Sequence, residues 1–295
     1  EVHVYAYGGR ACALWWEKAG AALARQPSLV VHEVPPEASR ALAALAARTM
    51  KLRGWQVIAT ARKVDDLERL RRIERVEALH LELTDPKSIA TCAISALEMT
   101  RGKLDAIFNN AAFGQPGAVE DLTPDVLREQ LEVNLIGAHD LTRRIIPAMR
   151  RNGAGRIVQC SSVLGFVSAP YRGAYSASKF ALEALSIAMR VELEGSGISV
   201  SIIEPGPIRS RFVETAVARM RSHIDMESSP HRENYVARLK SMDAGGKETF
   251  KLEPEAVTKR LIHALESARS RRRYYVTTPA YIAAAAQRLL PGFAN

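Results

Sequence analysis

The sequence predicts an α/β fold in which helices cover both faces of one doubly wound, parallel β-sheet. From residue 55 onward, short apolar runs alternate with longer segments of helical periodicity, the pattern of successive βαβ units. The short runs are almost continuously apolar and rich in β-branched residues, as strands buried on both faces are. No repeat or low-complexity linker interrupts the alternation, so we expect a single domain.

Apolar runs mark the expected strands. Six of them lie at residues 55–60, 78–83, 104–108, 156–160, 198–203 and 274–277. A shorter candidate strand, residues 29–31, precedes them. Such runs are bounded by polar or turn-forming residues, which favours strands over buried helices.

Two long helical patterns have recognisable ends. Thr123 is a suitable N-cap for a helix at 124–151, and Pro124 fits its first position, where no backbone N–H is needed. A second helix, at 174–193, stops at the Gly-Ser-Gly sequence of residues 195–197. Three- and four-residue spacing predicts one apolar face on this second helix, formed by Leu182, Leu185, Met189 and Leu193.

Residues 209–251 form an insertion between two expected strands. The segment is polar and helical in pattern, and insertions of this kind commonly cover a substrate site as a lid. Its apolar residues either line an apolar pocket or pack the lid onto the body of the protein. They are, with the residue that precedes the segment, Ile208, Phe212, Val213, Val217, Met220, Ile224 and Met226.

The charge balance is basic. Lys and Arg number 41 against 32 Asp and Glu, which gives a formal net charge of +9. Arginines cluster at 143–144, 150–151 and 271–273, but no aromatic residues interleave them and no nucleic-acid motif accompanies them. We therefore favour a solvated basic surface, which attracts anionic ligands, over binding of nucleic acid.

The composition is that of a globular protein, with 47% hydrophobic and 25% charged residues. No apolar run reaches the roughly 18–20 residues of a transmembrane segment, and the N-terminus lacks a basic-then-apolar signal pattern. Cys12, Cys92 and Cys160 are too few and too scattered for a disulfide framework or a zinc site. We expect a cytoplasmic protein without a metal.

The sequence Tyr175-Ser-Ala-Ser-Lys179 places a phenol and an ammonium four residues apart. On a helix they share one face, and a nearby cation lowers the pKa of a tyrosine from about 10 towards neutrality. A phenol tuned in this way can exchange a proton with a carbonyl or alcohol oxygen. An isolated pair of this kind would be an ordinary exposed Tyr and Lys. Here Ser162 lies thirteen residues upstream, and further polar turns accompany it.

These polar turns all follow expected strands. They occupy residues 62–63, 109–111, 161–162 and 205–208. The carboxyl ends of parallel strands lie at one edge of the sheet, where α/β proteins bind their ligands. The turns should therefore converge on one site.

With these motifs, residues 49 to about 290 resemble the short-chain dehydrogenase/reductase family. The resemblance rests on the Asn-Asn-Ala turn, the Ser-to-Tyr spacing, the YxxxK sequence and the Pro-Gly-Pro-Ile turn. Residues 57–62 and 274–279 resemble the branch that contains 17β-hydroxysteroid and retinol dehydrogenases and aldehyde reductases. The resemblance implies a Rossmann-like domain with the lid at about 209–251. It also implies a catalytic tetrad, which maps onto Asn134, Ser162, Tyr175 and Lys179.

The resemblance gives each tetrad residue a role. Tyr175 would protonate the carbonyl oxygen in reduction, or take the hydroxyl proton in oxidation, while Ser162 orients that oxygen. Lys179 would lower the pKa of Tyr175 and bind the nicotinamide ribose. Asn134 would hold a water next to Lys179; taken alone, Asn134 would be read as a mid-helix amide with its hydrogen bonds satisfied.

The same resemblance implies a dinucleotide cofactor and residues that contact it. Arg62 ends the second strand, where an arginine accommodates a 2′-phosphate, so NADP is expected rather than NAD; a solvated arginine is the alternative. Glu82 replaces the aspartate that the family usually has near the adenine. The full set implied by the resemblance is Arg62, Glu82, Leu83, Asn109, Ala111, Tyr175, Lys179, Pro205, Gly206, Ile208 and Ser210.

Residues 1–48 depart from the family. Its first strand should lead into a TGxxxGxG turn that holds the pyrophosphate, but the candidate strand 29–31 runs into a segment without glycine, residues 32–40. We therefore treat 1–48 as an atypical N-terminal segment and 49–295 as the Rossmann domain. The segment is a corrupted translation, a genuine divergence, or a sign that cofactor binding has been lost.

The resulting expectation is an NADP(H)-dependent oxidoreductase. It would interconvert an alcohol and an aldehyde or ketone, with an apolar substrate such as a steroid, retinoid or long-chain aldehyde. The alternative is a non-catalytic Rossmann-fold protein that acts through interactions. The family also implies a homodimer or homotetramer.

Overall fold

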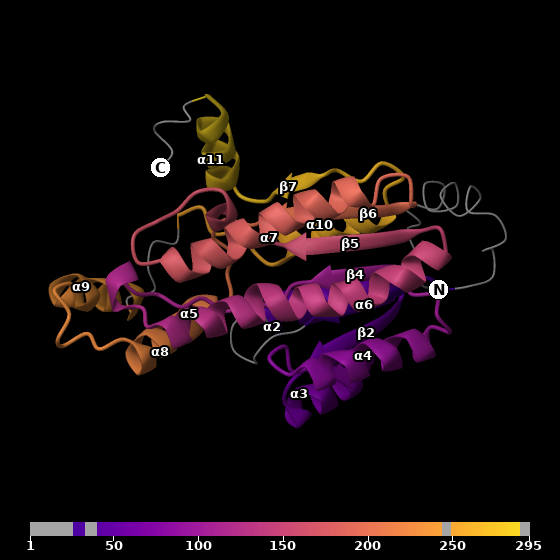
Figure 1. Ribbon diagram of the computed structural model, residues 1–295, viewed down its shortest axis with the longest axis horizontal. Helices are drawn as coiled ribbons and strands as arrows, with labels where there is room; N and C mark the ends of the chain where they lie inside the picture. The colour runs from indigo at the N-terminus through magenta and orange to yellow at the C-terminus, as the bar shows by residue number, and fades with distance from the viewer. Residues whose placement is uncertain (1–25, 33–39, 244–248, 290–295) are drawn as a thin grey trace, which may run out of the picture.

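The computed structural model describes residues 26–32, 40–243 and 249–289 (Figure 1). The described part contains a wholly parallel, seven-stranded sheet with strand order β3-β2-β1-β4-β5-β6-β7. Its strands are β1 (Ser28–His32), β2 (Gln56–Ala61), β3 (Glu77–His80), β4 (Ala106–Asn109), β5 (Gly155–Cys160), β6 (Ile198–Glu204) and β7 (Arg273–Tyr275). The predicted doubly wound α/β sheet is confirmed.

All the expected strands are present, although β3, β4 and β7 are shorter than their apolar runs. The chain builds the sheet outward from β1 to β3, and then crosses back to place β4 on the other side of β1. The topological switch point therefore lies between β1 and β4, where an α/β sheet binds its ligand beyond the carboxyl ends of the strands.

Helices pack on both faces of the sheet (Figure 1). One face carries α2 (Arg40–Leu52), α3 (Val64–Arg69) and α10 (Glu255–Glu266). The other carries α4 (Pro86–Met99), α6 (Ala138–Arg151) and α7 (Gly173–Glu192). Within β1, Leu29 and Val31 belong to the first core and Val30 to the second. Burial on both faces is why the strands read as unbroken apolar runs.

The remaining elements are short turns and peripheral helices. They are the π-helical turn η1 (Leu70–Glu74), the 3-10 turns η2 (Val119–Asp121) and η4 (Val163–Gly165), and the helices α8 (Phe212–His223), α9 (Arg232–Asp243) and α11 (Thr278–Leu289). Helix α11 projects from the body in Figure 1. In the described part of the chain, no helix combines the length and apolar character that crossing a bilayer requires.

The helix predicted at 124–151 contains a wider turn in its middle. It consists of α5 (Pro124–Leu131), the π-helical turn η3 (Glu132–Gly137) and α6. Thr123 caps it as predicted, because its side chain accepts a hydrogen bond from the N–H of Val126 at 3.4 Å. A π-helical turn inside an α-helix frequently marks a functional site.

Helix α7 buries three of the four residues predicted for its apolar face, Leu182, Met189 and Leu193. The prediction is wrong for Leu185, which is 40% exposed. Three helical steps turn a side chain by roughly 300°, so Leu185 lies about 60° away from Leu182, at the edge of the buried face.

The insertion 209–251 contains α8 and α9, so its predicted helical character is confirmed. A short parallel bridge joins Ile208 to Leu252 at its base. There the N–H of Arg209 donates to Leu252 O at 2.9 Å, and the N–H of Leu252 donates to Pro207 O at 3.1 Å. The two ends of the insertion therefore lie side by side.

The insertion also packs on the body of the protein. Met220, Ile224 and Tyr235 form a small buried cluster with Ala118. The hydroxyl of Tyr235 accepts a hydrogen bond from the N–H of Ala118 at 2.7 Å and donates one to Asp121 Oδ2 at 2.5 Å. Part of the apolar content of the insertion is thus explained by packing.

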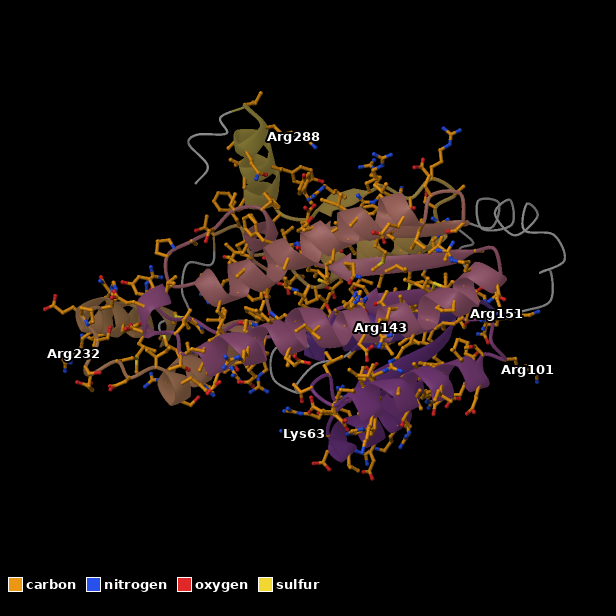
Figure 2. The ribbon with its side chains drawn as sticks, viewed as in Figure 1. Lys63, Arg101, Arg143, Arg151, Arg232 and Arg288 are labelled. Atoms are coloured by element: carbon orange, nitrogen blue, oxygen red, sulfur yellow. The ribbon has the colours of Figure 1, made fainter. Side chains whose placement is uncertain are left out.

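Strand β1 and the first part of α2 lie inside the segment 1–48, and α2 is continuous across residue 48. The domain boundary at that residue stays a prediction. The segment that replaces the glycine turn, residues 33–39, lies outside the described residues. Six basic side chains are labelled in Figure 2, among them Arg143 and Arg151 on α6, Arg232 on α9 and Arg288 on α11.

Candidate active site

A cavity of about 380 Å³ opens beyond the carboxyl ends of β4, β5 and β6. Apolar residues from the insertion, Phe212 and Val213, contribute to its wall. Among the residues predicted from the sequence, the lining includes Ser162, Tyr175, Lys179, Pro205, Gly206, Ile208 and Ser210. The structure therefore brings together three of the four predicted tetrad residues and the Pro-Gly-Pro-Ile turn.

Ser162 lies directly after β5, where it caps the turn η4. Its Oγ accepts a hydrogen bond from the N–H of Leu164 at 3.1 Å and donates one to Pro205 O at 3.4 Å. The same hydroxyl acts on the phenol of Tyr175, whose pKa it lowers. The serine is thus held between the β6 turn and the phenol, as an orienting group should be.

Tyr175 lies in the first turn of α7, with its ring edge-to-face against Phe212 at a centroid distance of 5.4 Å. Burial, followed by the charge of Cys160, raises the pKa of Tyr175 above its usual range, whereas the Ser162 hydrogen bond and Arg172 lower it. The predicted shift of the Tyr175 pKa towards neutrality is therefore wrong for this structure. Desolvation outweighs the cations, and Tyr175 keeps its proton at neutral pH.

Lys179 is buried one turn further along α7, with 2% of the residue exposed. Its Nζ donates a hydrogen bond to Cys160 O at 2.8 Å and lies 5.7 Å from the centroid of the Tyr175 ring. Burial lowers the pKa of Lys179, while the charges of Cys160 and Glu183 raise it. The predicted helix-face pairing of Tyr175 with Lys179 is present, but the ammonium lies beside the ring.

Asn134 lies in η3, outside the cavity lining. Its Oδ1 accepts a hydrogen bond from the N–H of Phe113 at 3.0 Å, and its Nδ2 donates to Phe113 O at 2.9 Å and to Ser178 Oγ at 3.1 Å. The side chain therefore ties the turn after β4 to α7. A water held next to Lys179 stays a prediction.

The residues predicted near the adenosine lie outside this cavity lining. Asn109 is buried and donates from Nδ2 to Thr142 Oγ1 at 2.7 Å, and Ala111 is buried beside it in sequence. Arg62 follows β2 and forms an ion pair with Glu82 at 3.5 Å. Leu83 is buried against η3.

Sequence reasoning missed Asn110, Arg172 and Lys251, which also line the cavity. Arg172 precedes Tyr175 by three residues, so helical spacing could have indicated that it lies beside the phenol. Asn110 belongs to the Asn-Asn-Ala turn, but only Asn109 and Ala111 of that turn were predicted to contact the cofactor. No pattern in the sequence indicates Lys251.

Two features of the cavity fit the nicotinamide end of a dinucleotide. The Nδ2 of Asn110 is buried without a hydrogen-bond partner in the described structure, which suits a polar ligand. A Cβ on Gly206 would lie 2.1 Å from Thr277 Oγ1, so only glycine lets the turn that lines this cavity pack so closely on Thr277. Pro205, Gly206 and Ile208 would hold the ring, and Lys179 the ribose.

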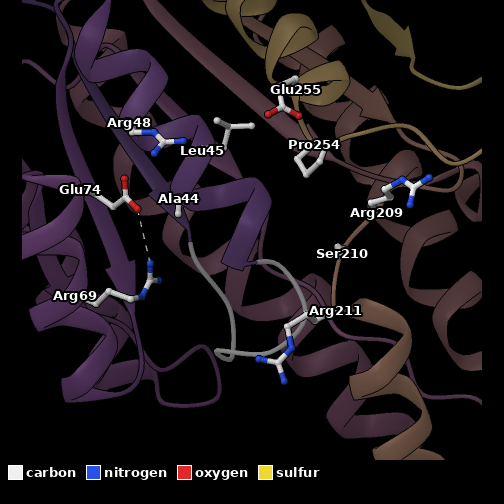
Figure 3. Close-up of a pocket in the computed structure, with 10 residues that line it drawn as sticks. All are labelled: Ala44, Leu45, Arg48, Arg69, Glu74, Arg209, Ser210, Arg211, Pro254 and Glu255. Atoms are coloured by element: carbon white, nitrogen blue, oxygen red, sulfur yellow. Dashed lines mark ion pairs between the residues drawn. The ribbon is translucent and has the colours of Figure 1, made fainter. Parts of the chain in front are cut away.

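A second pocket, of about 540 Å³, lies between α2, η1 and the start of the insertion (Figure 3). It shares Ser210 with the first cavity but contains none of the tetrad. Three of its four arginines take part in ion pairs: Arg69 with Glu74 at 3.9 Å, Arg209 with Glu253 at 2.8 Å and Arg211 with Glu214 at 2.8 Å. The pocket is therefore bordered by an ion-pair network.

A Rossmann-type sheet with a serine, a tyrosine and a lysine around one cavity at its switch-point edge defines a dinucleotide-dependent oxidoreductase. A family model described as short chain dehydrogenase matches residues 38–221. The chain belongs to the short-chain dehydrogenase/reductase family, whose members are NAD(P)-dependent enzymes acting on CH–OH and C=O groups. A second model, described as YaeQ protein, matches residues 1–63.

Individual relatives support this assignment. The chain is 41% identical over 243 residues to the uncharacterized oxidoreductase YbbO of Escherichia coli strain K12, covering 82% of this chain and 84% of that protein. It is 31% identical over 205 residues to 17-beta-hydroxysteroid dehydrogenase type 1 of Homo sapiens, covering 68% and 60%.

Solved structures show the same fold. A short-chain dehydrogenase from Streptomyces avermitilis has a TM-score of 0.74 and 26% identity, covering 90% of this chain and 93% of that one. A short chain dehydrogenase from Burkholderia cenocepacia in complex with NADP has a TM-score of 0.67 and 21% identity, covering 90% and 94%. A short chain dehydrogenase/reductase from Burkholderia phymatum in complex with NAD has a TM-score of 0.73 and 22% identity, covering 89% of this chain and 92% of that one.

Proposed function

We propose that this enzyme reduces aldehydes or ketones, and oxidises the matching alcohols, with NADP(H) as its coenzyme. The observation that carries the proposal is the convergence of Ser162, Tyr175 and Lys179 with the turn 205–208 on one cavity. Ser162 and Tyr175 both line that cavity, and Ser162 lowers the pKa of the Tyr175 phenol, so both hydroxyls can reach a single substrate oxygen.

In the proposed mechanism, a side chain of this protein supplies the proton that reduction requires. Bound NADPH supplies a hydride to the carbonyl carbon. Tyr175 donates its phenolic proton to the carbonyl oxygen, which Ser162 orients and polarises by a hydrogen bond. Lys179 holds positive charge behind the ring, where it stabilises the phenolate that remains.

The cavity wall supports an apolar substrate. Val163, Leu164, Phe212 and Val213 all line it, and the last two belong to the insertion. Of the two explanations for the apolar residues of the insertion, each therefore holds for a part: Met220 and Ile224 pack on the body, whereas Phe212 and Val213 face the cavity. We propose a lid role for 209–251 and a steroid, retinoid or long-chain aldehyde as the substrate class.

A binding titration followed by a substrate screen tests the proposal. NADPH and NADH are titrated in parallel into the purified chain by nicotinamide fluorescence, and carbonyl substrates of increasing chain length are then screened. Saturable NADPH binding with turnover of apolar carbonyls is expected. Absence of binding by either coenzyme would favour the non-catalytic interaction protein.

Replacing Arg62 by Gln should weaken NADPH binding by about 10- to 100-fold, because a charge-assisted bond to the 2′-phosphate contributes roughly 1.5–3 kcal/mol. NADH binding should change little, since NADH lacks that phosphate. Fluorescence titration gives both dissociation constants, and Arg151→Gln, on the exposed end of α6, is the charge-matched control. Equal weakening of both coenzymes would place Arg62 away from the phosphate.

The two directions of the reaction should respond differently to pH. Because the pKa of Tyr175 is raised, the protonated phenol predominates at neutral pH and reduction needs no deprotonation. Oxidation needs the phenolate, so its rate should rise by up to about tenfold per pH unit above pH 7. Initial rates in both directions from about pH 6 to 10 measure this. An oxidation rate that is flat across pH 7–9 would show that the phenolate already forms at neutral pH.

We also propose self-association into a homodimer or homotetramer. Helix α7 exposes Phe180, Ile187 and Val191 on its outer side, together with Leu185. Exposed apolar residues gathered on one helix are typical of a protein interface. Light scattering coupled to size-exclusion chromatography measures the mass; a monomer at micromolar concentration would contradict the proposal.

A further inference from the structure

Two buried carboxyl groups and a partly exposed arginine lie beneath the active site. Glu183 follows Lys179 by one turn of α7, Glu204 ends β6 and Arg273 begins β7. The side chain of Glu183 is 6% exposed and that of Glu204 is fully buried. Arg273 Nη1 lies 2.9 Å from Glu183 Oε2 and also forms an ion pair with Glu204 Oε1. One guanidinium nitrogen thus contacts both carboxyl groups.

The two carboxyl groups lie close to each other, because Nη1 of Arg273 contacts an oxygen of each. Two ionised carboxylates repel each other when they are buried side by side, and both can only accept hydrogen bonds, so a proton on one of them is favoured. Glu204 Oε2 is buried, and the described residues give it no N–H or O–H donor. A proton between Glu183 and Glu204 satisfies that oxygen, and it leaves one negative charge for the one positive charge of Arg273.

The electrostatics of the cluster agree with its geometry. Burial raises the pKa of Glu183, and burial followed by the charge of Glu183 raises the pKa of Glu204 to about 8. The titratable groups that act on the pair come from α7 and β7: Lys179, Arg190, Arg273 and Tyr275.

Lys179 needs a buried anion to remain an ammonium, because burial lowers its pKa. The charges of Cys160 and Glu183 oppose this lowering of the Lys179 pKa. Burial raises the pKa of the Cys160 thiol, which is therefore neutral at neutral pH. Glu183 remains as the anion that acts on Lys179.

We propose that Glu183 and Glu204 share one proton, and that the negative charge left on the pair keeps Lys179 in its ammonium form. Glu183 is a positioning residue, which acts on Tyr175 only through Lys179. This second role rests on the reductase activity proposed above, whereas the shared proton does not.

The shared proton can be tested on the cofactor-free chain by denaturant unfolding. An unfolded glutamate has a pKa of about 4.3 and Glu204 one of about 8, so between these values the folded state holds a proton that the unfolded state lacks. Between these two pKa values, Glu204 should lower the folding equilibrium constant by up to about tenfold for each unit that the pH rises. Glu204→Gln should remove that loss, while Glu192→Gln, on the exposed end of α7, should keep it.

A second measurement needs no variant. Infrared difference spectra of the wild-type chain should show the band of a protonated carboxyl group at pH 7 that disappears above about pH 9. The shared proton would be overturned if the free energy of unfolding depended on pH in the same way for wild type and Glu204→Gln. The absence of this band would overturn it as well.

The role of Glu183 is tested by the pH profile of reduction. Glu183→Gln should move the alkaline loss of kcat to lower pH by about one unit or more, because Lys179 loses its anion. Glu204→Gln should not shift the alkaline loss of kcat to lower pH, because Glu183 then stays ionised. A purely structural cluster would give equal losses in both variants without a shift, which would overturn this role. If the wild type reduces no carbonyl, the proposed function fails while unfolding still decides the shared proton.

Discussion

Replacing Tyr175 by Phe should lower kcat for carbonyl reduction by about 10²- to 10⁴-fold, the usual contribution of a positioned general acid. The phenol is the proposed proton donor and shares the cavity with Ser162, and Phe keeps the ring while removing the phenolic proton. The ring contact with Phe212 remains, so the fold should be retained. Single-turnover oxidation of bound NADPH measures the chemical step, and circular dichroism checks the fold.

Tyr281→Phe is the matched control for this change. Tyr281 is 47% exposed on α11, and its hydroxyl accepts a hydrogen bond from Arg260 at 3.3 Å. It makes no contribution to the cavity lining, so this variant should turn over like the wild type. Reduction by Tyr175→Phe within tenfold of the control would rule out Tyr175 as the proton donor.

Replacing Gly137 by Ala should destabilise the fold by about 3 kcal/mol, at the upper end of the usual cost of overpacking. Gly137 ends η3, and a Cβ there would lie 2.3 Å from the backbone oxygen of Leu83. Backbone cannot move aside as a flexible side chain can. The helix must therefore shift, and with it the side chain of Asn134.

Denaturant unfolding gives this loss of stability. His139→Ala, two residues further on and exposed, is the control and should change the free energy of unfolding by less than about 0.5 kcal/mol. A loss below about 1 kcal/mol for Gly137→Ala would mean that the contact with Leu83 can relax.

The sequence was sufficient for the sheet and for most of the catalytic constellation. The strands could be predicted because burial on both faces produces unbroken apolar runs, as at 104–108. Ser162, Tyr175 and Lys179 could be placed together because parallel strands end at one edge and helical spacing is fixed.

The remaining features depend on contacts between distant segments. The pKa of Tyr175 is decided by burial against Phe212, 37 residues away, which no helix spacing reveals. The pairing of Glu183 with Glu204 arises only when α7 packs beside β6. Asn134 was assigned from the family pattern, but its hydrogen bonds to Phe113 follow from the turn after β4. The boundary at residue 48 stays a prediction.

The bridge between Ile208 and Leu252 has a consequence for how this enzyme can diversify. The insertion begins and ends at one point on the body of the protein. It can therefore vary in length and composition without altering the strands. Phe212 and Val213 change with it, whereas Ser162, Tyr175 and Lys179 stay on the sheet and α7. With the lid role proposed above, substrate preference can change with this one segment while the residues that we propose for catalysis stay in place.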